Sequence, residues 1–340
     1  MTRKLVTVGV PVYNGERFLE ETLRSILNQS YADLEILISD NASTDRTPDI
    51  IRKFSDSRVV CRRNDATIPG EENWNLLLKA ARGEYIAIFH ADDVYSPRMV
   101  EEEVRFLDGH PEAGAVLTLM DFIDETGRIR GRTSLPKTLA PDAPLNFSAV
   151  FHALMRHGNS FLGCPTAMAR RSAYAAAGPF DYKNFGTSAD LGMWLKILER
   201  GPIGVLSEKL VKYRVHATSG GSRYQALRTE PADFFKVMDK YENSPALEIP
   251  PGDVELRQHA FHRQRDRLRR AVNLLAQNRI TEAKALLSEP WPARPLQACL
   301  ENCAVAKGLA ASAVIGAAMR LGFGGPAGRL MHRLISGSAS

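Results

Sequence analysis

Two adjacent carboxylates stand where an apolar segment of the sequence ends. Residues 84–89 have the pattern of a buried strand, and His90-Ala91-Asp92-Asp93 follows at once. Two neighbouring carboxylates repel each other unless they share a cation, and oxygen ligands suit Mg²⁺ or Mn²⁺. A divalent metal bound to a diphosphate would satisfy this arrangement. An exposed Asp-Asp turn before Pro97 explains the same residues without a ligand, so the motif alone leaves both interpretations open.

A further carboxylate, Asp190, stands at the predicted start of a helix over residues 190–199. A carboxylate in the first turn is stabilised by the helix dipole, which is the structural explanation. The functional explanation is a general base close to a metal. The spacing along the chain does not decide between them.

Two polar clusters follow earlier apolar segments. In the first, residues 11–16, we expect Pro11 to end the ladder of strand hydrogen bonds, and the ring of Tyr13 offers a flat face on which a base could stack. A plain strand–helix turn with a packed tyrosine is the alternative. In the second, residues 40–45, Asp40 is a candidate acceptor of a hydrogen bond from a base or a ribose.

The polar residues beside Asp40 have a simpler explanation. Ser43 and Asp45 are expected to cap a helix that begins near Thr47.

Alternating strands and helices are predicted to position these clusters. Apolar runs typical of buried parallel strands alternate with amphipathic segments typical of helices. The expected strands cover residues 5–12, 34–40, 58–62 and 84–89, and the expected helices cover residues 16–29, 47–54 and 71–81. This order predicts an α/β fold with a doubly wound, Rossmann-like, mostly parallel sheet, whose ligands bind at the carboxyl ends of the strands.

The second half of the chain has a weaker pattern. We expect a helix over residues 97–108, an extended segment over 115–120 and a loop or hairpin over 121–144. Three prolines predict a linker within residues 243–252. The segments expected to be helical after it are residues 254–287, with a helical hairpin over 268–287, and an amphipathic, Ala/Gly-rich tail over 300–335.

Composition restricts the class of protein. The 340 residues are 44% hydrophobic and 24% charged, as in an ordinary globular chain with one large domain and an appendage. No apolar run approaches the roughly 18 residues that span a bilayer, and residues 5–12 are too short for a signal peptide, so we expect a cytoplasmic protein. None of the four cysteines forms a CxxC pair, which favours free thiols over a zinc site.

Basic residues are concentrated near the C-terminus. Residues 253–340 contain thirteen Lys/Arg and six Asp/Glu, a formal net charge of +7 within a chain of +5. The remainder is slightly acidic, so no nucleic-acid partner is expected. The arginines cluster in one helical stretch, at Arg263, Arg265, Arg267, Arg269 and Arg270. Two interpretations stay open, docking on an anionic membrane surface and a helical cap that packs on the rest of the chain or on a second copy in a homo-oligomer.

Taken together, the motifs resemble the family 2 glycosyltransferases with the GT-A fold, over roughly residues 4–225. The resemblance depends on the order and spacing of residues 7–14, 40–45, 62–64, 73, 83–85, 90–93, 178–181, 189–190, 194–195 and 213–216. It implies a GT-A domain over residues 1–242, a linker over 243–252 and a helical basic region over 253–340.

The resemblance also assigns roles to individual residues. It implies that Asp190 is the general base and that Asp92, with His216 and Asp93, binds Mn²⁺ or Mg²⁺. It implies a nucleotide-sugar site made by Pro11, Tyr13, Glu16, Asp40, Asn41, Arg63, Asn73 and Asp92. The implied donor is a nucleotide diphosphate sugar, and one displacement by an acceptor hydroxyl inverts the anomeric centre.

Three features qualify the resemblance. His90 replaces the usual first Asp of the metal motif, and Ala189 replaces the acid that commonly precedes the base. The Gln/Arg/Trp element of processive, membrane-spanning synthases is not found, which favours transfer of a single sugar. The expected acceptor is a saccharide or a lipid-linked sugar, in surface polysaccharide or glycolipid synthesis at the inner face of the cytoplasmic membrane.

Two other functions stay in consideration. A nucleotidyltransferase also combines an α/β fold with a diphosphate and a metal, but usually begins with a Gly-rich basic loop. A non-catalytic protein that binds a sugar nucleotide, or a scaffold, would be compatible with His90 and Ala189.

Overall fold

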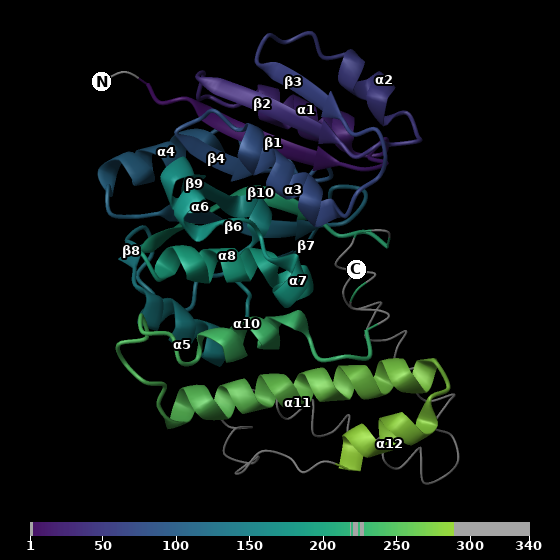
Figure 1. The fold of residues 1–340 in the computed structure, drawn as a ribbon, viewed down its shortest axis with the longest axis vertical. Helices are drawn as coiled ribbons and strands as arrows, with labels where there is room; N and C mark the ends of the chain where they lie inside the picture. The colour runs from purple at the N-terminus through teal and green to yellow at the C-terminus, as the bar shows by residue number, and fades with distance from the viewer. Residues whose placement is uncertain (1–2, 218, 220–223, 225–227, 289–340) are drawn as a thin grey trace.

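The computed structural model describes residues 3–217, 219, 224 and 228–288, and in them ten strands form one sheet covered by helices (Figure 1). The strands are β1 (Val6–Val12), β2 (Leu34–Asp40), β3 (Val59–Arg63), β4 (Tyr85–Ile88), β5 (Val94–Tyr95), β6 (Ala115–Ile123), β7 (Ile129–Arg132), β8 (Pro144–Leu145), β9 (Ala167–Arg170) and β10 (Ile203–Arg214). The α-helices are α1 (Leu19–Leu27), α2 (Thr47–Arg52), α3 (Gly70–Ala80), α4 (Met99–Gly109), α5 (Phe147–His157), α6 (Arg171–Ala177), α7 (Tyr182–Phe185), α8 (Ala189–Leu198), α10 (Asp233–Tyr241), α11 (Asp253–Ala276) and α12 (Ile280–Ser288). Two short 3-10 helices are η1 (Cys164–Thr166) and η2 (Gly186–Ser188).

The N-terminal part of the sheet is the doubly wound parallel sheet that the sequence predicted. β1 lies between β2 and β4, with β3 at the edge, and all neighbouring strands are parallel. β1 and β2 are buried along nearly their whole length, as parallel strands covered on both faces must be. The ends of the elements expected between residues 5 and 89 differ from the observed ends by at most three residues.

One detail of β1 contradicts the sequence-based prediction. Pro11 does not end the ladder, because β1 and β2 stay paired up to Val12 and Asp40. The N–H of Phe89, just after β4, donates to the carbonyl of Gly9, and alternate residues of a strand direct their backbone groups to the same side. The missing N–H of Pro11 therefore faces the side where β4 has already ended, and no ladder hydrogen bond is lost.

Beyond β4 the sheet is mixed. β9 is antiparallel to both β4 and β6, and β10 is parallel to β6 and antiparallel to β5. The order is β3-β2-β1-β4-β9-β6-β10-β5, with β7 beside β6 in the hairpin expected within residues 121–144, and β8 beside β10. β1, β2, β3, β4, β6 and β10 all point the same way, so their carboxyl ends lie along one edge of the sheet.

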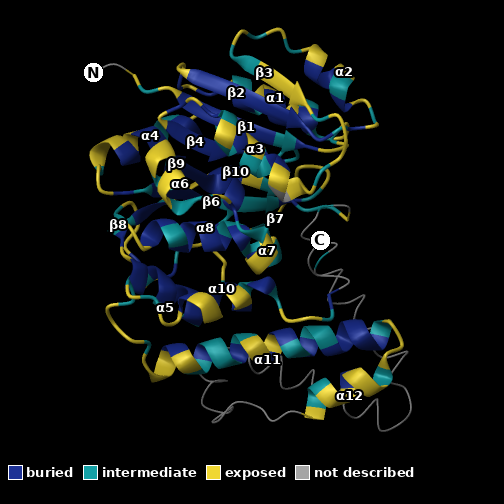
Figure 2. Cartoon of the chain, viewed as in Figure 1, coloured by how far each residue is buried: buried dark blue, intermediate teal, exposed yellow. Residues whose placement is uncertain are grey.

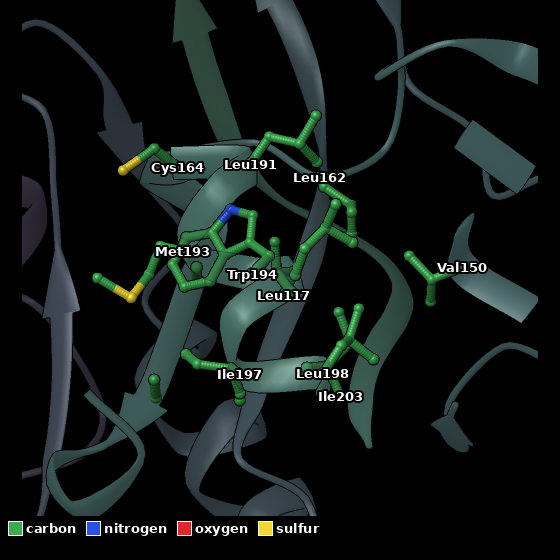
Figure 3. Close-up of a cluster of buried hydrophobic side chains, with 14 of the residues drawn as sticks. Leu117, Val150, Leu162, Cys164, Leu191, Met193, Trp194, Ile197, Leu198 and Ile203 are labelled. Atoms are coloured by element: carbon green, nitrogen blue, oxygen red, sulfur yellow. The ribbon is translucent and has the colours of Figure 1, made fainter. Parts of the chain in front are cut away.

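Helices bury the two faces of the sheet separately. α1, α2 and α4 cover one face, with Leu23, Ile50 and Leu107 in its core. α3, α5, α6, α8 and α10 contribute to the core of the other face. Trp194 of α8 is fully buried there among aliphatic side chains (Figure 3). This packing fixes α8, and with it the position of Asp190 in its first turn.

The C-terminal helices lie at the end of the molecule away from β1–β3 (Figure 1). α11 runs beside α5 and α10, where Glu255 forms an ion pair with Arg156 and His262 Nε2 lies 3.0 Å from the Arg156 carbonyl oxygen. α12 folds back on α11, in the helical hairpin that the sequence predicted. Figure 2 shows buried and exposed positions interleaved along α11. The tail expected over residues 300–335 lies outside the described residues.

None of the described helices combines the length and the apolar character needed to cross a membrane.

Candidate active site

The acidic pair follows β4 after Phe89, His90 and Ala91, and its second member is buried. Asp93 has no exposed side-chain surface, and its Oδ1 accepts a hydrogen bond from the backbone N–H of Arg214 at 2.7 Å. Within the part of the chain that the structure describes, neither Asp93 Oδ2 nor His90 Nε2 has a hydrogen-bond partner. Burial, together with the charge of Asp92, raises the pKa of Asp93 well above its usual range. An exposed Asp-Asp turn, the alternative left open by the sequence, is therefore wrong.

Asp92 is the partly exposed member of the acidic pair, and its side chain contacts His216. Its side chain is 32% exposed, and Asp92 Oδ2 lies 3.0 Å from His216 Nε2. Burial opposes ionisation of Asp92, but the hydrogen bond to His216 and the charge of His90 bring its pKa below the usual value. His90, Asp92 and Asp93 can each offer one ligand atom within 4.8 Å of the others. The structure thus brings together the metal ligands that the resemblance implied.

Arg214, the last residue of β10, forms hydrogen bonds with both members of the acidic pair. Its Nε donates to the Asp92 carbonyl oxygen at 2.9 Å, and its Nη2 donates to Glu21 Oε2 at 2.7 Å. The guanidinium lies 4.5 Å above the ring of Phe18, whose ring in turn contacts His216. Sequence reasoning gave Arg214 no role, because its burial and its partners appear only in the folded chain.

Asp190 is the second residue of α8, where its Oδ1 accepts a hydrogen bond from the N–H of Leu191 at 2.8 Å. Burial of the carboxylate raises its pKa to about 6, even though backbone hydrogen bonds act in the opposite direction. Ala189, at the position where an acid was expected, is buried. The first turn of α8 therefore presents a single carboxylate.

The buried thiol of Cys164 and the hydroxyl of the partly exposed Tyr213 are both affected by Asp190 and by the acidic pair. The pKa of the Cys164 thiol is raised by burial and then by the charges of Asp190 and Asp93. The pKa of the Tyr213 hydroxyl is raised by burial and by the charges of Asp93, Asp92 and Asp190. The Asp190 carboxylate lies beside the backbone of Cys164, and the turn η1 that Cys164 begins contacts β4, so Asp190 and the acidic pair lie on the same side of the sheet edge.

Asp40, at the end of β2, is buried and already paired. Its Oδ2 accepts a hydrogen bond from Arg63 Nη1 at 2.7 Å, and its Oδ1 accepts one from the N–H of Ser43 at 2.9 Å. Arg63 Nη2 also donates to the Ser43 carbonyl oxygen at 2.7 Å. The structure therefore brings Asp40 and Arg63 together, as a unit that supports the loop after β2.

Asn41 and Asn73 form hydrogen bonds with the end of β2 and with the segment after β3. Asn73 is buried and exchanges hydrogen bonds with Ser39, from Ser39 Oγ at 2.6 Å and to the Ser39 carbonyl oxygen at 3.0 Å. Asn41 Oδ1 accepts from the N–H of Ile68 at 3.0 Å and from Asn64 Nδ2 at 2.9 Å. Both amides thus hold the loop that carries Asn64 and Ile68, and their contact with a nucleotide stays a prediction.

The loop after β1 is joined to the loop after β2. The N–H groups of Asn14 and Gly15 donate to Ser43 Oγ at 2.9 Å and to Thr47 Oγ1 at 2.8 Å. Pro11 pairs with Ser39 in the strand register just before this loop. Tyr13 remains 53% exposed, as a ring that stacks on a ligand would be.

The remaining polar residues of these loops bind one another. Glu16 Oε2 accepts hydrogen bonds from Arg46. Asp45 accepts from the N–H of Thr47, the first residue of α2, and also from the N–H of Glu16, but the N-cap position itself is Arg46. Ser43 does not cap α2, since its hydroxyl binds Asn14 instead.

Comparison with known proteins agrees with this geometry. The model of glycosyl transferase family 2 matches residues 7–176. The glycosyltransferase EpsE of Bacillus subtilis (strain 168) is 34% identical over 214 residues, which cover 62% of this chain and 72% of EpsE. UDP-Glc:alpha-D-GlcNAc-diphosphoundecaprenol beta-1,3-glucosyltransferase WfaP of Escherichia coli is 29% identical over 218 residues, 64% of this chain and 79% of WfaP.

A solved structure has the same fold. The structure of S. aureus TarS 1–349 in complex with UDP superposes with a TM-score of 0.52 and 18% identity, over 94% of this chain and 92% of that chain. The sheet and the helices on its two faces are those of the GT-A fold. The chain belongs to glycosyl transferase family 2.

Proposed function

We propose that this glycosyltransferase moves one hexose or related sugar from a nucleoside diphosphate sugar to an acceptor hydroxyl, with inversion at the anomeric carbon. The observation that carries the proposal is the position of Asp190 in the first turn of α8, where its carboxylate lies beside the backbone of Cys164. Cys164 begins η1, which contacts β4, the strand that precedes the acidic pair. This supports a reaction centre bordered by the base on one side and by the acidic pair on the other.

Asp190 takes the proton from the acceptor hydroxyl. With a pKa of about 6, it is ionised at neutral pH and is a stronger base than an ordinary aspartate. The N–H of Leu191 holds one carboxylate oxygen in place, which orients the side chain. The acceptor oxygen attacks as it loses its proton, and a single displacement needs no second carboxylate as a nucleophile.

The residues around Asp92 fit a divalent metal, Mn²⁺ or Mg²⁺. Asp92, Asp93, His90 and His216 offer carboxylate oxygens and imidazole nitrogens, and Asp93 Oδ2 has no hydrogen-bond partner among the described residues. Asp92 and His216 are the principal ligands in this proposal, with Asp93 behind them. When bound, the metal would neutralise charge that develops on the leaving diphosphate. Asp92 and His216 hold their positions through their own contact and through Arg214.

The nucleoside binds at the carboxyl ends of β1, β2 and β3. Tyr13 stacks on the base, while Pro11 and Glu16 border it and the Asp40–Arg63 pair contacts the nucleoside. Asn41 and Asn73 support that surface through the hydrogen bonds described above. The exposed ring of Tyr13 and the buried carboxylate of Asp40 at the same edge of the sheet support this arrangement.

The acceptor is a saccharide or a sugar linked to a lipid diphosphate, as the name of the relative WfaP suggests. Such an acceptor lies at the cytoplasmic face of a membrane, and we propose that the basic region 253–340 docks there after a linker at 243–252. Val254 and Leu256, at the start of α11, are 40% and 54% exposed, and they support contact with an apolar surface.

Nucleotide release tests the catalytic proposal. We expect UDP-glucose, the soluble acceptor octyl N-acetyl-α-D-glucosaminyl diphosphate and Mn²⁺ to give UDP release that depends on the acceptor. Other nucleoside diphosphate sugars are the next donors to compare. If a nucleotide raises the melting temperature but no donor yields a product, the chain is a binding protein and the catalytic proposal fails.

Vesicle co-sedimentation tests the membrane proposal on the full chain. Anionic vesicles at low salt should pellet the protein, and a variant with Val254→Asp and Leu256→Asp should stay in solution. The matched control is Leu76→Asp, an exposed apolar position on α3. Equal pelleting of all three proteins would exclude this docking surface.

A further inference from the structure

Five aromatic rings form a continuous row beside the reaction centre. The ring of Trp74 lies 5.5 Å from that of His90, 5.5 Å from that of Phe180 and 6.0 Å from that of Tyr182, measured between centroids. The ring of His90 lies 6.2 Å from that of Tyr213. We call this row, Tyr213, His90, Trp74, Phe180 and Tyr182, the aromatic wall.

The aromatic wall differs from the buried core in its exposure. Phe180 is buried, but Trp74, His90, Tyr182 and Tyr213 each retain part of their surface in contact with solvent. Trp194, on the same side of the sheet, is fully buried, as a packing residue is. A tryptophan that stays half-buried beside polar site residues is able to offer a ring face or edge to a ligand.

Trp74 is held in place by its neighbours on α3. Asn75 Nδ2 donates to the Phe180 carbonyl oxygen at 3.2 Å, and Asn75 Oδ1 accepts from the Phe180 N–H at 2.9 Å. Asn73 is fixed to Ser39 on the opposite side. The indole of Trp74 is therefore preorganised, which lowers the conformational entropy lost when a ligand binds.

The aromatic wall lies on the acceptor side of the metal cluster. The proposed nucleoside residues come from the ends of β1, β2 and β3, on one side of β4, except Asn73 of α3, which is bonded to Ser39 of β2. From His90, after β4, the wall runs through Trp74 of α3 to Tyr182 of α7, and α7 contacts α8, the helix that carries Asp190. Since Asp190 acts on the acceptor hydroxyl, a ring along this path is closer to the acceptor than to the nucleoside.

We propose that the aromatic wall is the subsite for the acceptor sugar, with Trp74 packing against the C–H groups of a pyranose ring. A pyranose presents one face or edge of aliphatic C–H groups, and aromatic rings bury such surface without needing a hydrogen bond. Asp190 would then reach a hydroxyl on the periphery of the same ring. This inference rests on the proposed function and adds the class of the acceptor, a pyranoside, and the residues that select it.

Kinetics with two matched variants test the subsite. For Trp74→Ala we expect the KM for octyl N-acetyl-α-D-glucosaminyl diphosphate to rise about tenfold, the effect of a lost ring contact of moderate strength. The KM for UDP-glucose and its slow hydrolysis without acceptor should stay unchanged. Trp74→Phe should recover much of the loss, and Leu76→Ala, exposed on the same helix, should behave like the wild type.

Saturation-transfer difference NMR separates this inference from the proposed function. The wild-type protein with UDP and Mn²⁺ should transfer saturation to the pyranose C–H protons of the acceptor analogue, and Trp74→Ala should not. Absence of the signal from the wild type, an unchanged acceptor KM in Trp74→Ala, or a parallel loss of donor hydrolysis would overturn the subsite. Absence of catalysis in the wild type with the NMR signal intact would overturn only the catalytic proposal.

Discussion

The carboxylate of Asp233 accepts two hydrogen bonds from Thr187, one from its N–H and one from its Oγ1, both at 3.0 Å. Thr187 lies in η2, three residues before Asp190, whereas Asp233 begins α10. Gly186, just before Thr187, has φ +49, and a Cβ built there would collide with Asp233 Oδ2. The turn that leads to the proposed base is thus built around the Asp233 carboxylate.

We predict that Asp233→Ala lowers kcat about tenfold or more, because a base displaced by a fraction of an ångström loses its alignment. The affinity for UDP should not change, since the nucleoside residues lie on other strands. Steady-state kinetics and a UDP titration measure the two effects. Asp239→Ala, on the same helix but exposed, is the control, and an equal loss of UDP affinity in Asp233→Ala would contradict a role confined to the base.

The pH dependence of transfer should follow the ionisation of Asp190. Only the carboxylate can accept a proton, so kcat/KM should fall about tenfold per pH unit below a pKa of about 6. Asp190→Asn should lose about 10²–10⁴-fold in activity and the acidic limb with it. A pH series for both proteins provides the measurement. Near wild-type activity in Asp190→Asn would remove this residue from the mechanism.

The raised pKa of Asp190 also predicts how the stability of the protein depends on pH. Its folded pKa of about 6 exceeds the ordinary value of 3.8, so the folded state binds the proton more tightly than the unfolded state. Ionisation therefore lowers the free energy of unfolding above pH 6, and the penalty disappears as the pH falls to about 4. We expect Asp190→Asn to be more stable than the wild type by about 1–3 kcal/mol at pH 8. Urea unfolding at pH 8 and pH 4 compares the two, and an equal gain at both would rule out ionisation as the cause.

The proposed metal ligands should differ in strength. Asp92→Ala should abolish the increase in UDP affinity that Mn²⁺ produces. Asp92 is the partly exposed carboxylate of the pair, and the buried Asp93 cannot replace it as a ligand. His216→Ala should weaken the effect without removing it. Isothermal titration with UDP, with and without Mn²⁺ and after chelation, gives the comparison. UDP affinity that is indifferent to chelator and to Asp92→Ala would show that the metal assignment is wrong.

Glu103 of α4 is a buried carboxylate outside the proposed reaction. Its side chain is fully buried, and within the described part of the chain neither carboxylate oxygen has a hydrogen-bond partner. Burial raises its pKa well above the usual range, so the wild type loses stability as the pH rises above the ordinary pKa of a glutamate. Glu103→Gln should gain about 1–3 kcal/mol at pH 8 and less at pH 5. Thermal unfolding at both pH values checks this, with the exposed Glu101→Gln as a control that should show no such pH dependence.

The parts of the fold that the sequence predicted are those with a strong local pattern. β1, β2 and β4 are continuous apolar runs that end in polar residues, so both the strands and the acidic cluster after β4 could be located. β10 escaped prediction as a strand because its centre, from Leu206 to Lys209, carries exposed polar residues and shifts register against β6. The sequence shows this stretch as a polar interruption, whereas pairing with β6 makes it one continuous strand.

The residues missed at the site share a different property. Arg214 and Asp233 are polar side chains whose partners lie far away in the sequence, and nothing in their local surroundings signals those partners. The role of Trp74 was also hidden in the sequence. Helical spacing suggests a packing residue, and only the folded chain places its ring beside that of His90. Family resemblance assigned roles to Asp190 and His216, which the local pattern alone did not decide, and those roles stay predictions.

The contacts of Arg214 also determine when an active molecule exists during folding. The hydrogen bond from its N–H to Asp93 joins residues 121 positions apart, and its side chain reaches back 193 positions to Glu21. Contacts of such high sequence separation form late, because the chain must lose the entropy of a long loop before they can stabilise it. A chain that ends after Asp93 therefore holds the acidic pair but not its supports. The arrangement of the acidic pair depends on β10 joining the sheet, so the first and last strands of the domain support one site.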